Sequence, residues 1–240
     1  TPGAALLICA CATLAAAFVE SLPTGVDDNL GVPLIGGAPL YALTLVSPER
    51  LADPAPVHLS NLKAGLLANA AIAALALVAR AVKPSGAVAG IVVGTVTWTF
   101  GGWQAFAILM LFFVVATGAT KVGYAEKAAK KIAQADGGRR RARPAIANCG
   151  VPAFLAFLAA AAPYSEWFTI AMVAALATAV FDTVSSEIGQ VYGKHPFLIT
   201  TFRSVPAGTD GAVSVEGTLA GLAAATLLAR LEAWIPDEVS

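Results

Sequence analysis

The stretch SGAVAGIVVGTVTWTFGGWQAFAILMLFFVVATGAT, residues 85–120, contains no charged side chain. It is long enough for two membrane-crossing helices, which we expect at 85–101 and 104–120, because roughly 17–25 apolar residues span a bilayer. Comparable apolar windows lie at 3–19, 32–47, 63–82, 146–162, 167–182 and 212–231. The sequence therefore predicts an all-α, polytopic transmembrane protein with about 7–8 spans, of which the short window 32–47 is a candidate re-entrant segment.

The composition of the whole chain also favours a membrane protein. Of its 240 residues, 58% are hydrophobic and 12% are charged, and the mean hydropathy is +0.75. Soluble domains are typically about half apolar and about a quarter charged, so an alanine-rich soluble helical bundle is the less favoured alternative. The formal net charge is zero and by itself says nothing about partners. We expect no nucleic-acid partner for a membrane protein of this kind. The cysteines Cys9, Cys11 and Cys149 lack metal-ligand spacing and are expected to be small packing residues.

A proline-rich stretch, SPERLADPAPVHLSN at 47–61, divides the chain. Its prolines Pro48, Pro54 and Pro56 are unfavourable inside a helix, so we expect a linker at 48–61 between one unit at 1–47 and another at 62–240. The chain begins without Met or a positively charged leader, and we expect it to be a piece of a longer protein.

Positive charge is concentrated on one side of the predicted bundle. Residues 121–143 hold eight of the fifteen Lys and Arg. The expected spans place this loop on the same side as 20–31, 83–84 and 183–211, and put twelve basic residues there, against Arg50, Lys63 and Arg230 on the other side. The positive-inside rule then assigns the basic side to the cytoplasm or its topological equivalent, and the polar segments below lie on it.

Two of these segments have two interpretations each. Asp27 and Asp28, in VESLPTGVDDNLGVP at 19–33, either bind Mg²⁺, which uses one or two carboxylates together with substrate phosphates, or form an Asx turn and helix cap. The basic loop at 121–143 either contacts anionic lipid head groups or binds phosphates through its arginines. Asn148, just inside the next span, needs a polar partner there.

The segment FDTVSSEIG at 181–189 places two acids at the end of an apolar span. Glu187 lies about 140° around a straight helix from Asp182. The two carboxylates therefore meet on one ion only if the helix breaks near Ser185. One helical face is shared by Asp182, Ser185, Ser186 and Gly189.

The segment AGTDG at 207–211 opens the last span. Gly208 and Gly211 permit a positive φ and a close backbone approach, and N–H groups at a helix start attract phosphate. With Thr200, Thr201 and Arg203 nearby in the sequence, this segment indicates a phosphate site more than a plain turn. His195 is expected to be a solvated loop residue.

Residues 62–231 resemble an integral membrane family whose plant and cyanobacterial members are phytyl-phosphate kinases. The resemblance rests on PSGAVAGIVVGTVTWTFGGW (84–103), ATKVG (119–123), GGRRRARPAIANCGV (137–151), FDTVSSEIG (181–189) and ITTFRSVPAGTDGAVSVEGTLAG (199–221). Residues 1–40, with TLAAAFVESLPTGVDDNLGVPLIGG (13–37), are similar to the C-terminal end of phytol and dolichol kinases. The resemblance implies a CTP-dependent kinase that converts a phytyl-type prenyl monophosphate to the diphosphate, fused to a remnant of a phytol kinase, in phytol salvage and tocopherol-type biosynthesis.

The resemblance also suggests roles for the polar residues. Asp182 and Glu187 would bind Mg²⁺, with Asp27 and Asp28 as further candidate metal ligands. Lys121, Arg140 and Arg203 would neutralise phosphate charge during transfer. The nucleotide would contact Asn148, Ser186, Thr200, Thr201, Gly208, Thr209, Asp210 and Gly211. The implied location is a bacterial inner membrane or a plastid envelope, with the active face at the cytoplasmic or stromal end.

Three alternatives remain at this point, and the third, a non-catalytic membrane subunit, is favoured if nucleotide binding is undetectable. A CTP-using lipid cytidylyltransferase would also need a metal and a nucleotide site, but it would make a CDP-lipid. A membrane transporter would explain acids within helices, since such acids often mark ion pathways. Analysis of the reaction product distinguishes the first alternative, and uptake into proteoliposomes distinguishes the second.

Overall fold

The computed structural model describes residues 38, 41–52, 55–231 and 233. The chain divides into two compact units, residues 1–53 with 161–163 and residues 54–160 with 164–240. Asp27, Asp28 and the expected span 3–19 lie outside the described residues. So does nearly all of the segment at 1–40 that resembles the end of a phytol kinase.

The expected linker at 48–61 is largely helical. Helix α3 covers Pro48–Ala52 and α4 covers Ala55–Val78, so the expectation of a poor helix is wrong for these residues. The prolines are compatible with helices because Pro48 and Pro56 fall in a first turn, where a proline does not remove an internal hydrogen bond. The boundary between the two compact units falls between residues 53 and 54, inside the expected linker.

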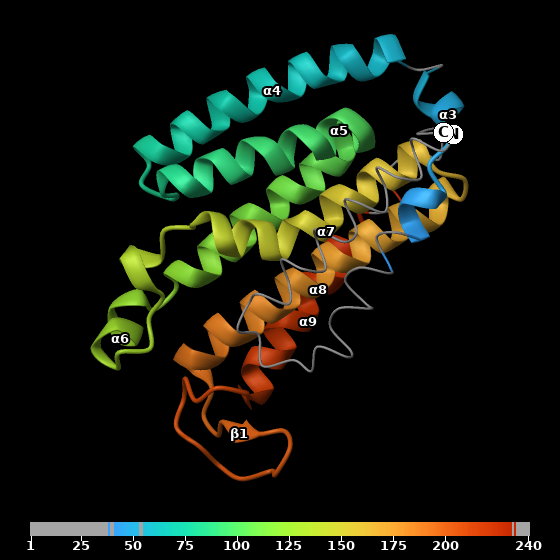
Figure 1. Ribbon diagram of the computed structural model, residues 1–240. Helices are drawn as coiled ribbons and strands as arrows, with labels where there is room; N and C mark the ends of the chain where they lie inside the picture. Colours follow the sequence, from blue (N-terminus) through green and yellow to red (C-terminus); the bar gives the residue numbers. More distant parts are fainter. Residues whose placement is uncertain (1–37, 39–40, 53–54, 232, 234–240) are drawn as a thin grey trace. The chain divides into compact units, whose positions relative to one another are not determined.

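Helix α5, Pro84–Lys121, is a hairpin of two antiparallel helices. Its 38 residues would extend about 57 Å if straight, yet Arg140 contacts both of its ends. The backbone N–H of Arg140 donates to the carbonyl of Ala81, and its side chain donates to the carbonyl of Ala116. The chain reverses at Gly102, whose φ of 71° and ψ of −177° are accessible essentially to glycine alone. The expected spans 85–101 and 104–120 are therefore confirmed, and Figure 1 shows the reversal.

Three further apolar helices follow the hairpin. They are α7 (Ala142–Ala161), α8 (Ser165–Tyr192) and α9 (Val215–Ala229). Within the described part of the chain, α4, α5, α7 and α8 are long and apolar enough to cross a membrane, and α9 is shorter and apolar. This architecture confirms the predicted polytopic helical membrane protein.

The core of the second unit lies where the second half of α5 meets α8 and α9. It is built from fully buried side chains such as Ile108, Leu176, Val180 and Leu228. Helices α8 and α9 approach closely because Gly217 and Gly221 lack side chains. A Cβ atom at Gly217 would lie 2.3 Å from the carbonyl oxygen of Ser185. Such small-residue contacts are common between membrane helices, and here they fix the start of α9 against the end of α8.

The α4–α5, α5–α7 and α8–α9 connections gather at one end of the unit, which we call the loop face. It contains the α4–α5 turn, the basic loop with α6 (Tyr124–Ala129) and the 3₁₀ turn η1 (Ala135–Gly138), and the segment 193–214. In that last segment β1 (Phe197–Leu198) pairs antiparallel with β2 (Ala212–Val213). Figure 1 shows α6, β1 and the α4–α5 turn at this end. The predicted placement of 83–84, 121–143 and 183–211 on one side is thereby confirmed for the described residues.

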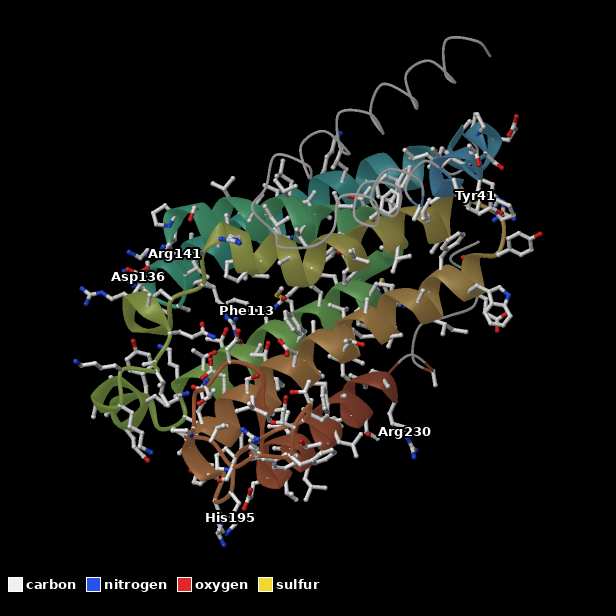
Figure 2. The ribbon with its side chains drawn as sticks, turned by 60° about the horizontal axis from the view of Figure 1, so that its bottom comes forward. Tyr41, Phe113, Asp136, Arg141, His195 and Arg230 are labelled. Atoms are coloured by element: carbon white, nitrogen blue, oxygen red, sulfur yellow. The ribbon has the colours of Figure 1, made fainter. Side chains whose placement is uncertain are left out.

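The opposite end of the unit carries exposed aromatic side chains. Trp103 lies in the hairpin turn, and Tyr164 and Trp167 lie at the start of α8, all more than half exposed. Aromatic side chains of this kind are typical of the membrane–water interface. Figure 2 shows Arg230 far from Asp136 and Arg141 of the loop face. This agrees with the prediction that Arg230 is one of the few cations on the side opposite the basic loop.

Candidate functional site

A buried ion pair attaches the basic loop to α8. The Lys127 Nζ atom lies 2.5 Å from Glu187 Oε2, and the two side chains are 1% and 3% exposed. Lys127 also donates to the carbonyl of Thr120 at 3.0 Å, and Gln134 donates to Glu187 Oε1 at 2.6 Å. Both carboxylate oxygens of Glu187 and two of the three N–H donors of Lys127 therefore have partners, which favours a buried ion pair.

Arg140 joins the basic loop to both halves of the α5 hairpin. Its Nη2 atom donates to the Ala116 carbonyl at 2.9 Å and to Thr120 Oγ1 at 3.2 Å. Burial lowers the pKa of the Arg140 guanidinium, and the negative charge of Glu187 opposes that change. Because an arginine pKa starts so high, the group stays cationic.

A second, more exposed cluster, of ion pairs, lies directly before the start of α7. Asp136 forms ion pairs with Lys83, at 3.2 Å, and with Arg141. Figure 2 shows Asp136 and Arg141 side by side. The hydrogen bond from Arg141 lowers the pKa of the Asp136 carboxyl, and the bond from Lys83 lowers it further. This cluster fixes the η1 turn to the α4–α5 connection.

A polar pocket lies between the end of α8 and the start of α9, and its empty volume, including the part open to solvent, is about 580 Å³. Three residues of the predicted polar face of α8 line it, Ser185, Ser186 and Gly189. The fourth member of that face, Asp182, is exposed and does not line the pocket. The opposite wall consists of Pro196 and the continuous stretch Ala207–Ser214, which contains the predicted GTDG segment.

The GTDG segment forms a tight turn directly before β2 and α9. Gly208 and Gly211 have φ of 85° and 73°. Thr209 donates from its side chain to the carbonyl of Pro206 at 2.7 Å, and Ser214 caps α9 by accepting from the Gly217 N–H. The N–H groups of Asp210 and Gly211 make no hydrogen bond to any other residue that the structure describes. These N–H groups can therefore donate to an anion in the pocket.

An apolar cavity lies among α4, both halves of α5 and the start of α7. Its empty volume, including the part open to the surroundings, is about 790 Å³. Alanine, valine, leucine and phenylalanine side chains make up most of its wall. The polar lining residues are Asn69, Arg140 and Asn148, and Arg140 is the charged one among them.

The predicted site residues are distributed over several places on the loop face. Ser186, Gly208, Thr209, Asp210 and Gly211 meet in the polar pocket. Asn148 lies on the wall of the apolar cavity with Arg140. Lys121, Thr200, Thr201 and Arg203 are exposed and line neither the pocket nor the cavity. His195 projects from its loop, as expected for a solvated residue (Figure 2).

The two acids of FDTVSSEIG are not brought together. Helix α8 continues unbroken to Tyr192, so Asp182 faces outward and Glu187 faces the basic loop. Glu187 is paired with Lys127, and the described residues contain no cluster of three or more His, Cys, Asp or Glu that could hold a metal. Metal binding by Asp182 and Glu187 stays a prediction. Among the residues that line the polar pocket, Asp210 supplies the carboxylate.

Three polar residues with buried or partly buried partners were not predicted from the sequence, namely Lys127, Gln134 and Asn69. Lys127 lies in a run of basic residues at 121–143, and no local pattern separates it from the solvated lysines of that loop. Asn69 carried a clearer sign, since a lone amide in an apolar span needs a partner. The structure gives it the carbonyl of Gly65 at 2.8 Å.

The comparisons with known proteins agree with this architecture. Protein VTE6 of Arabidopsis thaliana, described as chloroplastic, is 42% identical over 159 residues, which cover 65% of this chain and 48% of the plant protein. An uncharacterized membrane protein of Synechocystis, sll0875, is 39% identical over 171 residues, covering 69% of this chain and 66% of its own length. Protein PGR of Arabidopsis thaliana is 34% identical over 155 residues, covering 59% and 54%.

The chain thus spans between about half and two thirds of the length of these relatives. No solved structure matches it. The model of the family described as integral membrane protein DUF92 matches residues 67–238, which include α5, α7, α8, α9 and the whole loop face. With its helical membrane architecture, the chain belongs to the DUF92 family of integral membrane proteins.

Proposed function

We propose that this protein is a membrane-embedded, nucleotide-dependent prenyl-phosphate kinase that acts in prenyl-lipid metabolism. The observation that carries the proposal is the pairing, on one unit, of a polar pocket built around GTDG with an apolar cavity that contains an arginine. A kinase for an isoprenyl phosphate needs both, because one substrate is a nucleotide and the other has an apolar chain. The similarity to the chloroplastic protein VTE6 supports the same assignment.

In the proposed reaction, a phosphate oxygen of the isoprenyl monophosphate forms a bond to the terminal phosphorus of CTP. The bond from that phosphorus to the bridging oxygen breaks, and CDP leaves with the electron pair. The acceptor needs no general base, because a phosphate monoester with a second pKa of about 6 is largely a dianion at neutral pH. The protein then acts mainly through alignment and charge neutralisation.

The chain's own residues would divide this work. The N–H groups of Asp210 and Gly211 would donate to nucleotide phosphates in the polar pocket, and Ser186 would line the opposite wall. Arg140 would neutralise the acceptor phosphate. Mg²⁺, if bound, would reduce repulsion between the phosphates, and the Asp210 carboxylate fits its preference for one or two carboxylates together with phosphate oxygens. The loop face would be cytoplasmic or stromal, in agreement with its excess of Lys and Arg.

The direct test incubates the full chain in lipid nanodiscs with phytyl phosphate, Mg²⁺ and CTP labelled at its γ-phosphate. We expect labelled phytyl diphosphate and CDP, and none after chelation of Mg²⁺. An Asp210→Asn variant should lose about 10²-fold in kcat/KM, the scale typical for a group that stabilises transition-state charge. The matched control is Glu166→Gln, which changes an exposed acid in the first turn of α8, far from the loop face. Formation of a CDP-lipid and pyrophosphate would show a cytidylyltransferase instead.

A further inference from the structure

The wall of the apolar cavity extends over about two turns on each of its helices. On α5 it runs from Gly86 to Val93, and on α4 it runs from Asn69 to Ala76. At 1.5 Å per residue, seven residues correspond to a depth of about 10 Å. Arg140 lies at the end where α5 begins, because Gly86 contacts its carbonyl oxygen.

The charge of Arg140 is not matched by a carboxylate. None of the ion pairs formed by the described residues includes it. Its two side-chain hydrogen bonds go to neutral oxygens of Ala116 and Thr120, and both use the same nitrogen. A guanidinium has five N–H donors in a planar fork, so several remain for another group. A half-buried cation without a directly paired anion is costly. The carboxylate of Glu187 acts on Arg140 only from a distance and is itself paired with Lys127, which points to an anionic partner from outside the chain.

We propose that the apolar cavity binds the tail of a single-chain isoprenyl phosphate, with the phosphate of that ligand on Arg140. The choice of an isoprenyl phosphate rests on the function proposed above, whereas the charge and the cavity are independent of it. An arginine fork matches the oxygens of a phosphate monoester bidentately. The first part of the tail, about 10 Å, lies between α4, α5 and α7, and the rest of a longer tail leaves the cavity for the bilayer.

The position of Gly86 explains how the charge reaches the cavity. A Cβ atom at this residue would lie 2.3 Å from the carbonyl oxygen of Arg140. Glycine therefore lets the backbone at 139–141 pass directly over the first turn of α5. The same passage is fixed by the hydrogen bond from the Lys83 N–H to the Arg140 carbonyl at 2.9 Å. The cation is held at the cavity by backbone contacts that do not depend on its side chain.

Two glycines of α5 give a matched pair of variants for the test. A Cβ atom at Gly90 or at Gly118 would meet nothing within 4 Å, so both positions accept a side chain. Gly90 lines the cavity and Gly118 does not. We expect Gly90→Phe to weaken binding of phytyl phosphate about tenfold, or about 1.4 kcal/mol, and Gly118→Phe to leave it unchanged. Equal binding by both variants would overturn the proposal.

Binding is measured without nucleotide, using the full chain in nanodiscs and a fluorescent isoprenyl phosphate. Unlabelled phytyl phosphate should displace the probe, and phosphatidic acid, a two-chain phosphate monoester, should displace it at least tenfold less well. Equal displacement by phosphatidic acid would show an ordinary lipid site and overturn the assignment. Arg140→Gln should weaken binding of phytyl phosphate but not of phytol, and equal losses for both ligands would exclude a role for the charge.

A third measurement uses the unaltered protein and a phytyl phosphate that carries a diazirine within the first part of its tail. Crosslinks should map to cavity residues of α4, α5 and α7, and crosslinks confined to other surfaces would overturn the proposal. The outcome is separable from that of the kinase assay. Crosslinks in the cavity without diphosphate formation would leave the site in place and remove the proposed activity. Equal activity in the Gly90→Phe and Gly118→Phe variants would instead leave the proposed activity in place and remove the cavity as its binding site.

Discussion

The Lys127 Nζ and Glu187 Oε2 atoms lie 2.5 Å apart, sixty residues apart in sequence and almost completely buried. This pair joins the basic loop to the end of α8. Ser186, the neighbour of Glu187, lines the polar pocket, and Thr120, the second partner of Lys127, also accepts from Arg140. A continuous set of polar contacts therefore links the arginine of the apolar cavity to the residue next to the polar pocket.

Breaking this pair should be costly. Lys127→Met or Glu187→Gln leaves a buried group without its partner, and each variant should lose about 3–5 kcal/mol of unfolding free energy. The double variant Lys127→Met with Glu187→Leu should lose less than the sum of the two. Unfolding in detergent with increasing denaturant measures these values. In the exposed pair of Lys130 with Glu126, Lys130→Met should cost no more than about 0.5 kcal/mol, and a similar cost at Lys127 would contradict its burial.

The reversal at Gly102 gives a second prediction. Gly102→Ala places a side chain in a conformation that costs non-glycine residues about 1–3 kcal/mol, so the thermal midpoint should fall. Gly118→Ala, in the same helix with regular geometry and open space, should be neutral or stabilise by up to about 1 kcal/mol. If the two alanine variants behaved alike, the hairpin would not reverse at Gly102.

The Asp136 cluster predicts a loss of stability in acid. Because Arg141 and Lys83 lower the pKa of Asp136 in the folded protein, its stabilising contribution is complete above the ordinary Asp pKa of about 3.9 and is lost as the pH falls through the lower folded value. Asp136→Asn should reduce the drop in thermal midpoint between pH 6 and pH 3. Asparagine tolerates the positive φ of this position, so backbone strain does not confound the comparison. An unchanged drop would exclude the carboxyl as its source.

The GTDG turn packs against the basic loop, which predicts an effect on nucleotide binding. A Cβ atom at Gly208 would lie 2.6 Å from Ile132 Cγ2, so Gly208→Ala should displace the turn and raise the KM for CTP about tenfold, or about 1.4 kcal/mol. Adding Ile132→Ala removes the collision and should restore part of the affinity. Gly137→Ala has a similar positive φ but no neighbour within 4 Å, and it should leave the KM unchanged. The same KM change in Gly137→Ala would show that strain alone is responsible.

Much of the fold follows from the sequence because membrane-crossing helices depend on the local density of apolar residues. The charge-free stretch at 85–120 predicted two spans, and the structure has both, joined at Gly102. The polar pocket was partly predictable because its signal is also local in the sequence. Glycines with polar neighbours indicate turns that bind anions. The expectation of a poor helix at 48–61 was wrong for the described residues, because prolines in a first helical turn are easily mistaken for helix breakers.

The remaining features depend on tertiary partners and were not predictable from local patterns. Nothing near Lys127 in the sequence shows that its charge is buried, because its partner is sixty residues away. Glu187 was predicted as a metal ligand from its residue type, whereas its surroundings pair it with a lysine. The apolar cavity exists only where three helices leave space between them. Arg140 was predicted to contact phosphate, but its place on that cavity required the structure.

The hairpin of α5 has a consequence for how the protein enters the membrane. Both of its ends lie at the loop face, and its turn, Gly101 to Gln104, carries no charge. The translocated part of residues 84–120 therefore contains no ionised group that must be moved through hydrocarbon, where Lys or Arg costs about 2.5–3.5 kcal/mol on an insertion scale. We expect this segment to insert as one unit from the side that synthesises it. Gln104→Arg should slow that insertion in a translation assay with membranes, whereas an added arginine beside Lys121 should not.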